Sequence, residues 1–142
     1  MKYFLLGIVV TLLILPVAGF LYIRSSYMSV AATDPPLPFE KFLASMALRD
    51  RIQLQAPQRD VSGFATADLV TGAQVFQKNC AFCHGLPQQP TSIAGSGMFP
   101  HAPLFTTKGS VSDDPAGVTY WKGNNGIRLT GMPSFKAALT DQ

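Results

Sequence analysis

Two cysteines and a histidine lie close together in the middle of the chain, and they are the residues best suited to chemistry. The stretch reads Cys80-Ala81-Phe82-Cys83-His84 and contains both cysteines of the 142-residue sequence. A Cys-x-x-Cys-His motif is the signature of covalent haem attachment, in which the two thiols bind the haem vinyl groups. The adjacent histidine then becomes an axial ligand of the iron. The motif therefore predicts one covalently bound haem c.

The same residues admit two other interpretations. A Cys-x-x-Cys pair can act as a thioredoxin-like redox pair, but that motif needs a βαβ context, which the flanking sequence does not provide. The pair can also supply half of a structural zinc site, but a second pair of ligands is missing, because His101 is the only other histidine. Haem attachment is therefore favoured over both.

A haem iron with one histidine ligand needs a second axial ligand or keeps an open site. Methionine raises the reduction potential of such an iron. Met132 is the favoured candidate, because the ring of Pro133 fixes φ and suits a ligand on a rigid extended loop. Met98 and His101 are the rivals, and an iron without a sixth ligand is the remaining alternative.

Three stretches of the sequence are predicted to be helical. In residues 38–52, apolar residues recur at i, i+3, i+4 and i+7, which gives the helix one apolar face. Residues 67–80 follow a capping residue, Thr66, and lead into the motif. Residues 112–122 begin with a capping residue, acids and a proline. The prolines and glycines of residues 85–105 exclude a long helix or strand, so we expect a small all-α domain.

An apolar run at the N-terminus predicts a membrane anchor. Residues 3–23 carry no charge, and a run of about 20 apolar residues can cross a bilayer as a helix. A cleaved signal peptide is the alternative, but it needs a shorter apolar region and a small-x-small site just beyond it. The nearest such site, at residues 30–32, lies several residues past Arg24. In either case the segment is an export signal.

These features divide the chain into three parts. An anchor at residues 1–24 precedes a tether at residues 25–65 and a domain at residues 66–142. The amphipathic helix within the tether either packs on the domain or docks to the membrane surface or a larger complex.

Charge and composition say little about partners. The formal net charge is +3 and no basic cluster is present, so nucleic-acid binding finds no support. No general base, nucleophile or second metal cluster is visible, and no small-molecule substrate is identified. We therefore do not expect the chain to be an enzyme by itself. The expected partners are the membrane and redox proteins.

Two stretches resemble the class I c-type cytochromes, which are small all-α monohaem electron carriers. Gly72–His84 contains the haem motif, and Asn125–Phe135 reads Asn-Gly-Ile-Arg-Leu-Thr-Gly-Met-Pro-Ser-Phe. The second stretch is similar to that of membrane-anchored bacterial members. The resemblance covers about half of the chain, from about residue 66 to the end. It implies that Cys80 and Cys83 hold the haem, with His84 as proximal ligand and Met132 as distal ligand.

The resemblance also implies roles for residues around the haem. A proline carbonyl accepts the proximal imidazole N–H in this family, and Pro103 matches it best. Phe105 stands where the family often has a leucine that contacts the haem. Trp121 and Arg128 are candidates to hold the propionates. The alternative is that Trp121 is a core residue and Arg128 is solvated.

In one respect the sequence departs from the family. Class I domains close with a C-terminal helix that packs across the first helix, at positions matching Gly72 and Phe76. This sequence stops at Leu139-Thr140-Asp141-Gln142, so the final helix is expected to be missing and the domain C-terminally incomplete. Donation of a helix by a partner, or replacement by the 38–52 helix, are the alternatives. Gly72 within a helix predicts a close helix crossing.

Together these features predict a membrane-tethered carrier of single electrons, acting alone or as the cytochrome subunit of a respiratory or dehydrogenase complex. It is expected to be a single-pass protein of the bacterial inner membrane, with the haem domain on the periplasmic side. A haem-based ligand sensor or peroxidase with a displaceable sixth ligand is the alternative. A scaffold protein without haem is a third interpretation.

Overall fold

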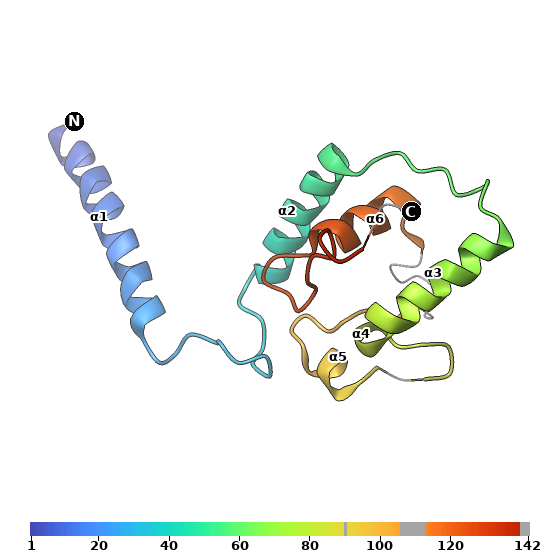
Figure 1. Ribbon diagram of the computed structural model, residues 1–142. Coiled ribbons are helices and arrows are strands. Elements are labelled where there is room, and N and C mark those ends of the chain that lie inside the picture. Colours follow the sequence, from blue (N-terminus) through green and yellow to red (C-terminus); the bar gives the residue numbers. More distant parts are fainter. Residues whose placement is uncertain (90, 106–112, 140–142) are drawn as a thin grey trace. The chain divides into compact units, whose positions relative to one another are not determined.

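The computed structural model describes residues 1–89, 91–105 and 113–139. These ranges contain six helices and no strand, apart from an isolated bridge between Leu86 and Gln89 (Figure 1). The helices are α1 (Lys2–Arg24), α2 (Glu40–Gln55), α3 (Thr66–Asn79), α4 (Ala81–His84), α5 (Ile93–Gly97) and α6 (Ala116–Asn125). The predicted all-α class is therefore confirmed for the described residues.

The chain divides into two compact units, Met1–Leu37 and Pro38–Gln142. The first unit contains α1, which has no buried residue and whose most apolar 18-residue window has a mean hydropathy of 2.7. A helix of 23 residues is about 35 Å long, which exceeds the roughly 30 Å hydrocarbon core of a bilayer. By its length and composition α1 can cross a membrane, which fits the predicted anchor.

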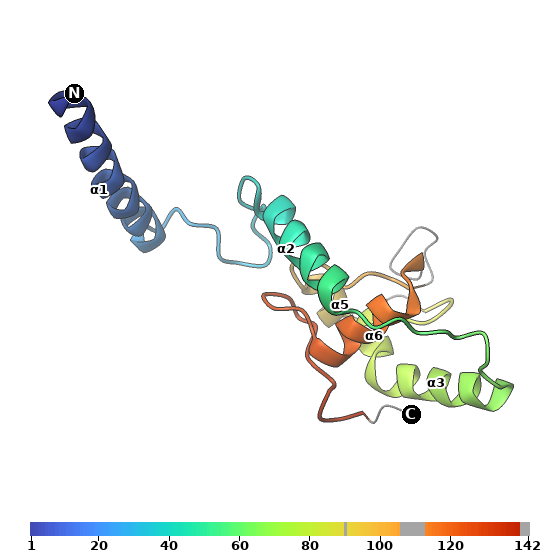
Figure 2. The ribbon, with the colours of Figure 1, turned by 90° about the horizontal axis from the view of Figure 1, so that it is seen from above.

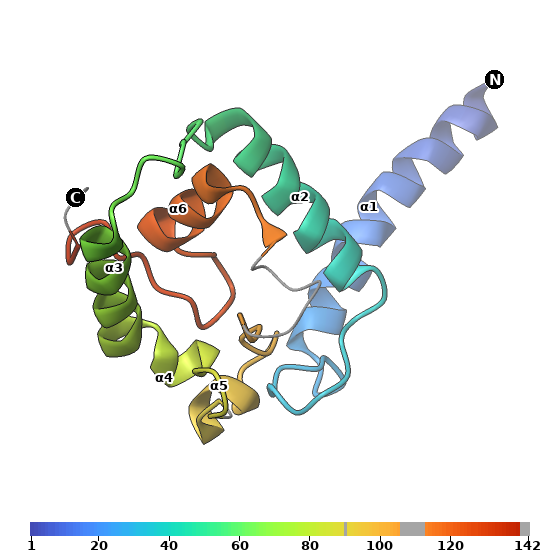
Figure 3. The same ribbon diagram turned by 90° about the vertical axis from the view of Figure 1, so that its right-hand side faces the viewer.

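The amphipathic helix predicted at residues 38–52 is α2, which packs on α6 within the second unit (Figures 2 and 3). Ile52 of α2 is 8% exposed and is the one buried apolar side chain among the described residues. Just after α2, the carbonyl oxygen of Pro57 lies against Gly117 of α6, where there is no space for a side chain. Of the two roles open to this helix, the structure shows packing on the domain.

The second unit begins at Pro38 and includes α2. Residue 66, where the sequence predicts the start of the domain, is the first residue of α3 within this unit. The apolar face of α2 is visible in the sequence, but the surface that covers this face is not. Residues 25–37 are the link between α1 and the second unit.

The N-terminus of α3 is capped differently from the prediction. Thr66 is the first helical residue, and Ala65 occupies the N-cap position. Asp68 replaces the expected capping side chain, because its carboxylate accepts a hydrogen bond of 2.9 Å from the Ala65 N–H. Satisfying this backbone donor and placing a negative charge in the first turn both stabilise the helix.

Among the described residues, no helix crosses α3 at Gly72, where the helix that the sequence lacks was expected to pack. No atom lies within 4 Å of the point where a side chain at Gly72 would begin. The 38–52 helix therefore does not cover this face of α3, since α2 packs on α6 instead. Phe76, one turn further along α3, packs edge-on against Phe105 with ring centroids 5.5 Å apart.

The third predicted helix is α6, which runs from Ala116 to Asn125. Its predicted start at residue 112 lies outside the described residues. Its end differs from the prediction, because the helix continues past residue 122 through Gly123, Asn124 and Asn125. Gly126 ends the helix with a φ of +68°, a conformation that glycine adopts without strain.

Candidate haem-binding site

The Cys-x-x-Cys-His motif begins at Cys80, which directly follows α3, and continues through the single helical turn of α4. The amide of Cys83 donates to the carbonyl of Cys80 at 3.1 Å, and the amide of His84 donates to the same carbonyl at 2.9 Å. Gly85 ends the turn with a φ of +71°, and a Cβ atom there would lie 3.0 Å from the side chain of Leu104. The backbone thus fixes both thiols and the imidazole on one short turn.

A hydrogen bond orients the imidazole of His84. Its Nδ1 lies 2.8 Å from the carbonyl oxygen of Pro103, which is the contact that the family resemblance implies. A carbonyl oxygen can only accept, so Nδ1 carries a proton, and in the neutral ring Nε2 keeps a free lone pair. Such a bond fixes the tautomer and makes the ring a stronger metal ligand. The structure therefore prepares Nε2 to bind a metal ion.

Aromatic packing supports the same ring. Phe105 lies against His84 with ring centroids 4.8 Å apart and an angle of 60° between the ring planes. Its other neighbour is Phe76 of α3. Phe105 therefore joins the helix that leads into the motif to the imidazole.

The short helix α5 packs on the motif from another direction. Gly95 is buried, and a Cβ atom at this position would lie 2.5 Å from the carbonyl oxygen of Cys83 and 3.1 Å from its Cα. A side chain at residue 95 would therefore push α5 away from the attachment turn. The sequence suggested no role for Gly95, because its contact is with a residue on a different helix.

The two thiols are partly exposed and free. Burial raises the pKa of the Cys80 thiol, and the nearby Cys83 raises it further. An unmodified Cys80 therefore remains a neutral thiol at physiological pH.

Met132 lies in a loop, residues 126–135, that we call the methionine loop. Within the loop, the amide of Ile127 donates to the carbonyl of Met132 at 3.2 Å, and the amide of Met132 donates to Oγ1 of Thr130 at 3.1 Å. Two further hydrogen bonds attach the loop to the end of α6. The amide of Phe135 donates to the carbonyl of Gly123 at 3.1 Å, and Oγ of Ser134 donates to the carbonyl of Asn124 at 2.6 Å. The backbone on both sides of Met132 is thus held in place.

The other candidate residues are placed as follows. Met98 ends α5 and contacts Gly131 of the methionine loop. His101 is exposed. The indole N–H of Trp121 donates to Oε1 of Gln55 at 3.3 Å, so the structure directs it to α2, and Arg128 is exposed. Gln55 was not visible as a partner in the sequence, because it precedes Trp121 by 66 residues.

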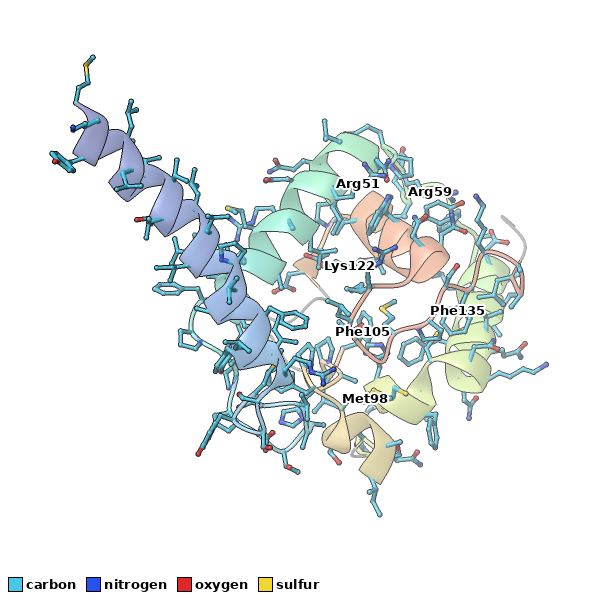
Figure 4. All side chains as sticks on the ribbon, turned by 90° about the vertical axis from the view of Figure 1, so that its left-hand side faces the viewer. Arg51, Arg59, Met98, Phe105, Lys122 and Phe135 are labelled. Atoms are coloured by element: carbon cyan, nitrogen blue, oxygen red, sulfur yellow. The ribbon has the colours of Figure 1, made fainter. Side chains whose placement is uncertain are left out.

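A second contact joins the segment that follows α2 to α6. The guanidinium of Arg59 lies 3.5 Å from the ring centroid of Tyr120, next to Trp121. On the same helix, Lys122 forms an ion pair with Asp114 at 2.5 Å. Figure 4 shows Arg59 and Lys122 on the side of the domain formed by α2 and α6.

The residues present fit a haem c group. Two thiols and a histidine whose Nε2 is free form the donor set that covalent attachment requires. Eight apolar side chains in these segments are half-buried and could cover a flat apolar ligand: Phe76, Leu86, Met98, Leu104, Phe105, Ile127, Met132 and Phe135. The fold and this donor set together define a c-type cytochrome domain.

The comparisons with known proteins agree. Residues 67–142 match the family described as cytochrome c oxidase, cbb3-type, subunit III. The match covers more than half of the chain, so the chain belongs to this family of c-type cytochrome domains, which carry covalent haem c. No curated protein and no solved structure matches the chain significantly.

Proposed function

We propose that the chain is a membrane-tethered carrier of single electrons whose haem iron is ligated by His84 and Met132. The observation that carries the proposal is the 2.8 Å contact between His84 Nδ1 and the Pro103 carbonyl. It supports ligation by Nε2, because it fixes both the orientation of the ring and the position of its proton.

The bound haem would supply one-electron chemistry between its ferrous and ferric states. The protein contributes the attachment by Cys80 and Cys83, the orientation of His84 and a thioether from Met132. A thioether ligand raises the reduction potential, which suits an acceptor of electrons. The hydrogen bonds of the methionine loop support this role, because they hold the residue that must stay in place during electron transfer.

The proposed location is the periplasmic side of the bacterial inner membrane, with α1 as a single-pass anchor. Residues 25–37 link α1 to the second unit. A link of this length spans at most about 45 Å when fully extended. The haem domain would therefore stay near the membrane, and we propose that its partners belong to a membrane-bound respiratory or dehydrogenase complex.

Carbon monoxide binding and the Met132→Ala variant test the ligation. The native ferric protein is expected to show the far-red sulfur-to-iron absorption band, and the native ferrous protein is expected to exclude carbon monoxide. Met132→Ala should lose the band, bind carbon monoxide and have a lower reduction potential, because the thioether is gone. Met46→Ala is the matched control, since Met46 is 45% exposed on α2.

Two results would contradict the proposal. Rapid binding of carbon monoxide by the native protein would favour a ligand sensor or peroxidase. A pyridine haemochrome spectrum without thioether-linked haem would remove the electron carrier altogether.

A further inference from the structure

Met98 stands at the end of a helix that is fixed against the haem motif. It follows α5, in which Gly95 packs on the backbone of Cys83. The amide of Gly95 donates to Oγ of Ser92 at 3.1 Å, and the amide of Ala102 donates to the carbonyl of Gly95 at 3.2 Å. The position of Met98 is therefore tied to the turn that carries the attachment cysteines.

The side chain of Met98 reaches from there to Gly131, the residue before the proposed sixth ligand. A Cβ atom at residue 131 would lie 3.0 Å from Cε of Met98, 3.1 Å from its Cγ and closer still to its sulfur. Because Gly131 has no side chain, the thioether can pack directly on the backbone of the methionine loop.

Hydrogen bonds hold the methionine loop from its other end. The hydrogen bonds described for it run within the loop or to the last turn of α6. Met98 contacts the loop from the opposite side, where α5 packs on the motif. It therefore connects the part of the protein that holds the proximal ligand to the part that holds Met132.

We infer that Met98 is a positioning residue, which packs on Gly131 and so keeps Met132 from being displaced by small ligands. The inference rests on the proposed ligation by Met132. The contribution comes from the volume of the side chain and not from its sulfur, so leucine should replace methionine at this position.

Imidazole binding to the ferric, detergent-solubilised full-length holoprotein tests the inference. Imidazole binds only when the sixth ligand is displaced, so its apparent affinity reports the population of that state. Met98→Ala is expected to bind imidazole about tenfold more tightly and to show a weaker far-red band, because the loop loses its support. Met98→Leu should stay within about twofold of the native affinity, as should the control Met46→Ala.

The outcomes separate this inference from the proposed function. An unchanged affinity in Met98→Ala, while Met132→Ala still loses the band, overturns the positioning role alone. Loss of the band in Met98→Leu and its survival in Met132→Ala would make Met98 the ligand and overturn both.

If Met98→Ala yields no holoprotein, Gly131→Ala serves instead, because its new methyl group presses on Met98. It should raise the affinity about threefold, and no change would overturn the inference.

Discussion

His84 lies on the helical turn α4, which also carries Cys83 and directly follows Cys80, whereas Met132 lies in an irregular loop more than forty residues further along the chain. The His84 side is fixed by short-range helical hydrogen bonds and by one long-range bond to Pro103. The Met132 side depends on α6, which in turn depends on α2. The proximal side should therefore be the stable part of the site, and the distal side should be the adjustable part.

The strongest test of this difference is the Phe105→Ala variant on the proximal side. Phe105 contacts both His84 and Phe76, so its loss removes the packing that joins α3 to the imidazole. We expect the free energy of unfolding to fall by about 3 kcal/mol, the low end for a truncated core phenylalanine, because the ring is half-buried. Urea unfolding of the holoprotein, followed by haem absorbance, measures this change.

Phe82→Ala is the matched control for that variant. Phe82 lies inside the motif but is 66% exposed, so its truncation should change the stability by less than about 0.5 kcal/mol. Equal losses in the two variants would show that the Phe105 contacts add nothing specific to the proximal side.

The second test addresses the support of the distal side by the segment that directly follows α2. Gly117→Ala places a methyl group against the carbonyl oxygen of Pro57, and backbone atoms cannot move aside as a flexible side chain can. We expect a loss of about 2 kcal/mol, which is typical of an overpacked position. The far-red band should also weaken, because the end of α6 holds the methionine loop. Thermal and urea unfolding, with the band intensity, report both effects.

Gly123→Ala provides the control on the same helix. No atom lies within 4 Å of a side chain placed at Gly123, so alanine meets open space there. It should raise the stability by up to about 1 kcal/mol, since alanine favours a helix over glycine. A destabilisation as large as that of Gly117→Ala would mean that the contact with Pro57 is not the cause.

The comparison also explains which parts of the molecule the sequence could predict. The motif, the helix before it and the Met132-Pro133 pair are short-range patterns, and each of these predictions depends on neighbours in the chain. The packing of α2 on α6 was not predictable in detail, because amphipathicity shows that a face is covered but not by which surface. The hydrogen bond between Trp121 and Gln55 was also not predictable, because the two residues are far apart in the sequence.

Two local predictions of helix ends were wrong, because a nearby side chain forms a hydrogen bond with the backbone at each end. The carboxylate of Asp68 reaches back to the Ala65 N–H, which moves the cap one residue before Thr66. The Gly123-Asn124-Asn125 sequence is typical of a turn, yet α6 continues through it. The side-chain amide of Asn125 donates to the carbonyl of Trp121 at 2.9 Å, which helps to satisfy the last turn of the helix.

The smallest expected effect comes from Thr130→Val within the methionine loop. Oγ1 of Thr130 donates to the Ile127 carbonyl at 2.8 Å and accepts from the Met132 N–H at 3.1 Å, so one hydroxyl closes the turn that presents Met132. Valine keeps the shape of the side chain and removes both hydrogen bonds. The ordered conformation of the methionine loop should therefore lose about 1 kcal/mol of stability. The expected result is about fivefold tighter imidazole binding to the ferric protein with little change in unfolding.

Thr119→Val is the control for this variant, because Thr119 is exposed on α6 and outside the loop. It should leave imidazole affinity unchanged. If Thr130→Val instead lowers global stability and leaves imidazole affinity unaltered, the loop would unfold only together with the whole domain. The distal side would then be as rigid as the proximal side, and the proposed difference between them would not hold. A change confined to ligand affinity would locate the adjustable part of the site in the methionine loop.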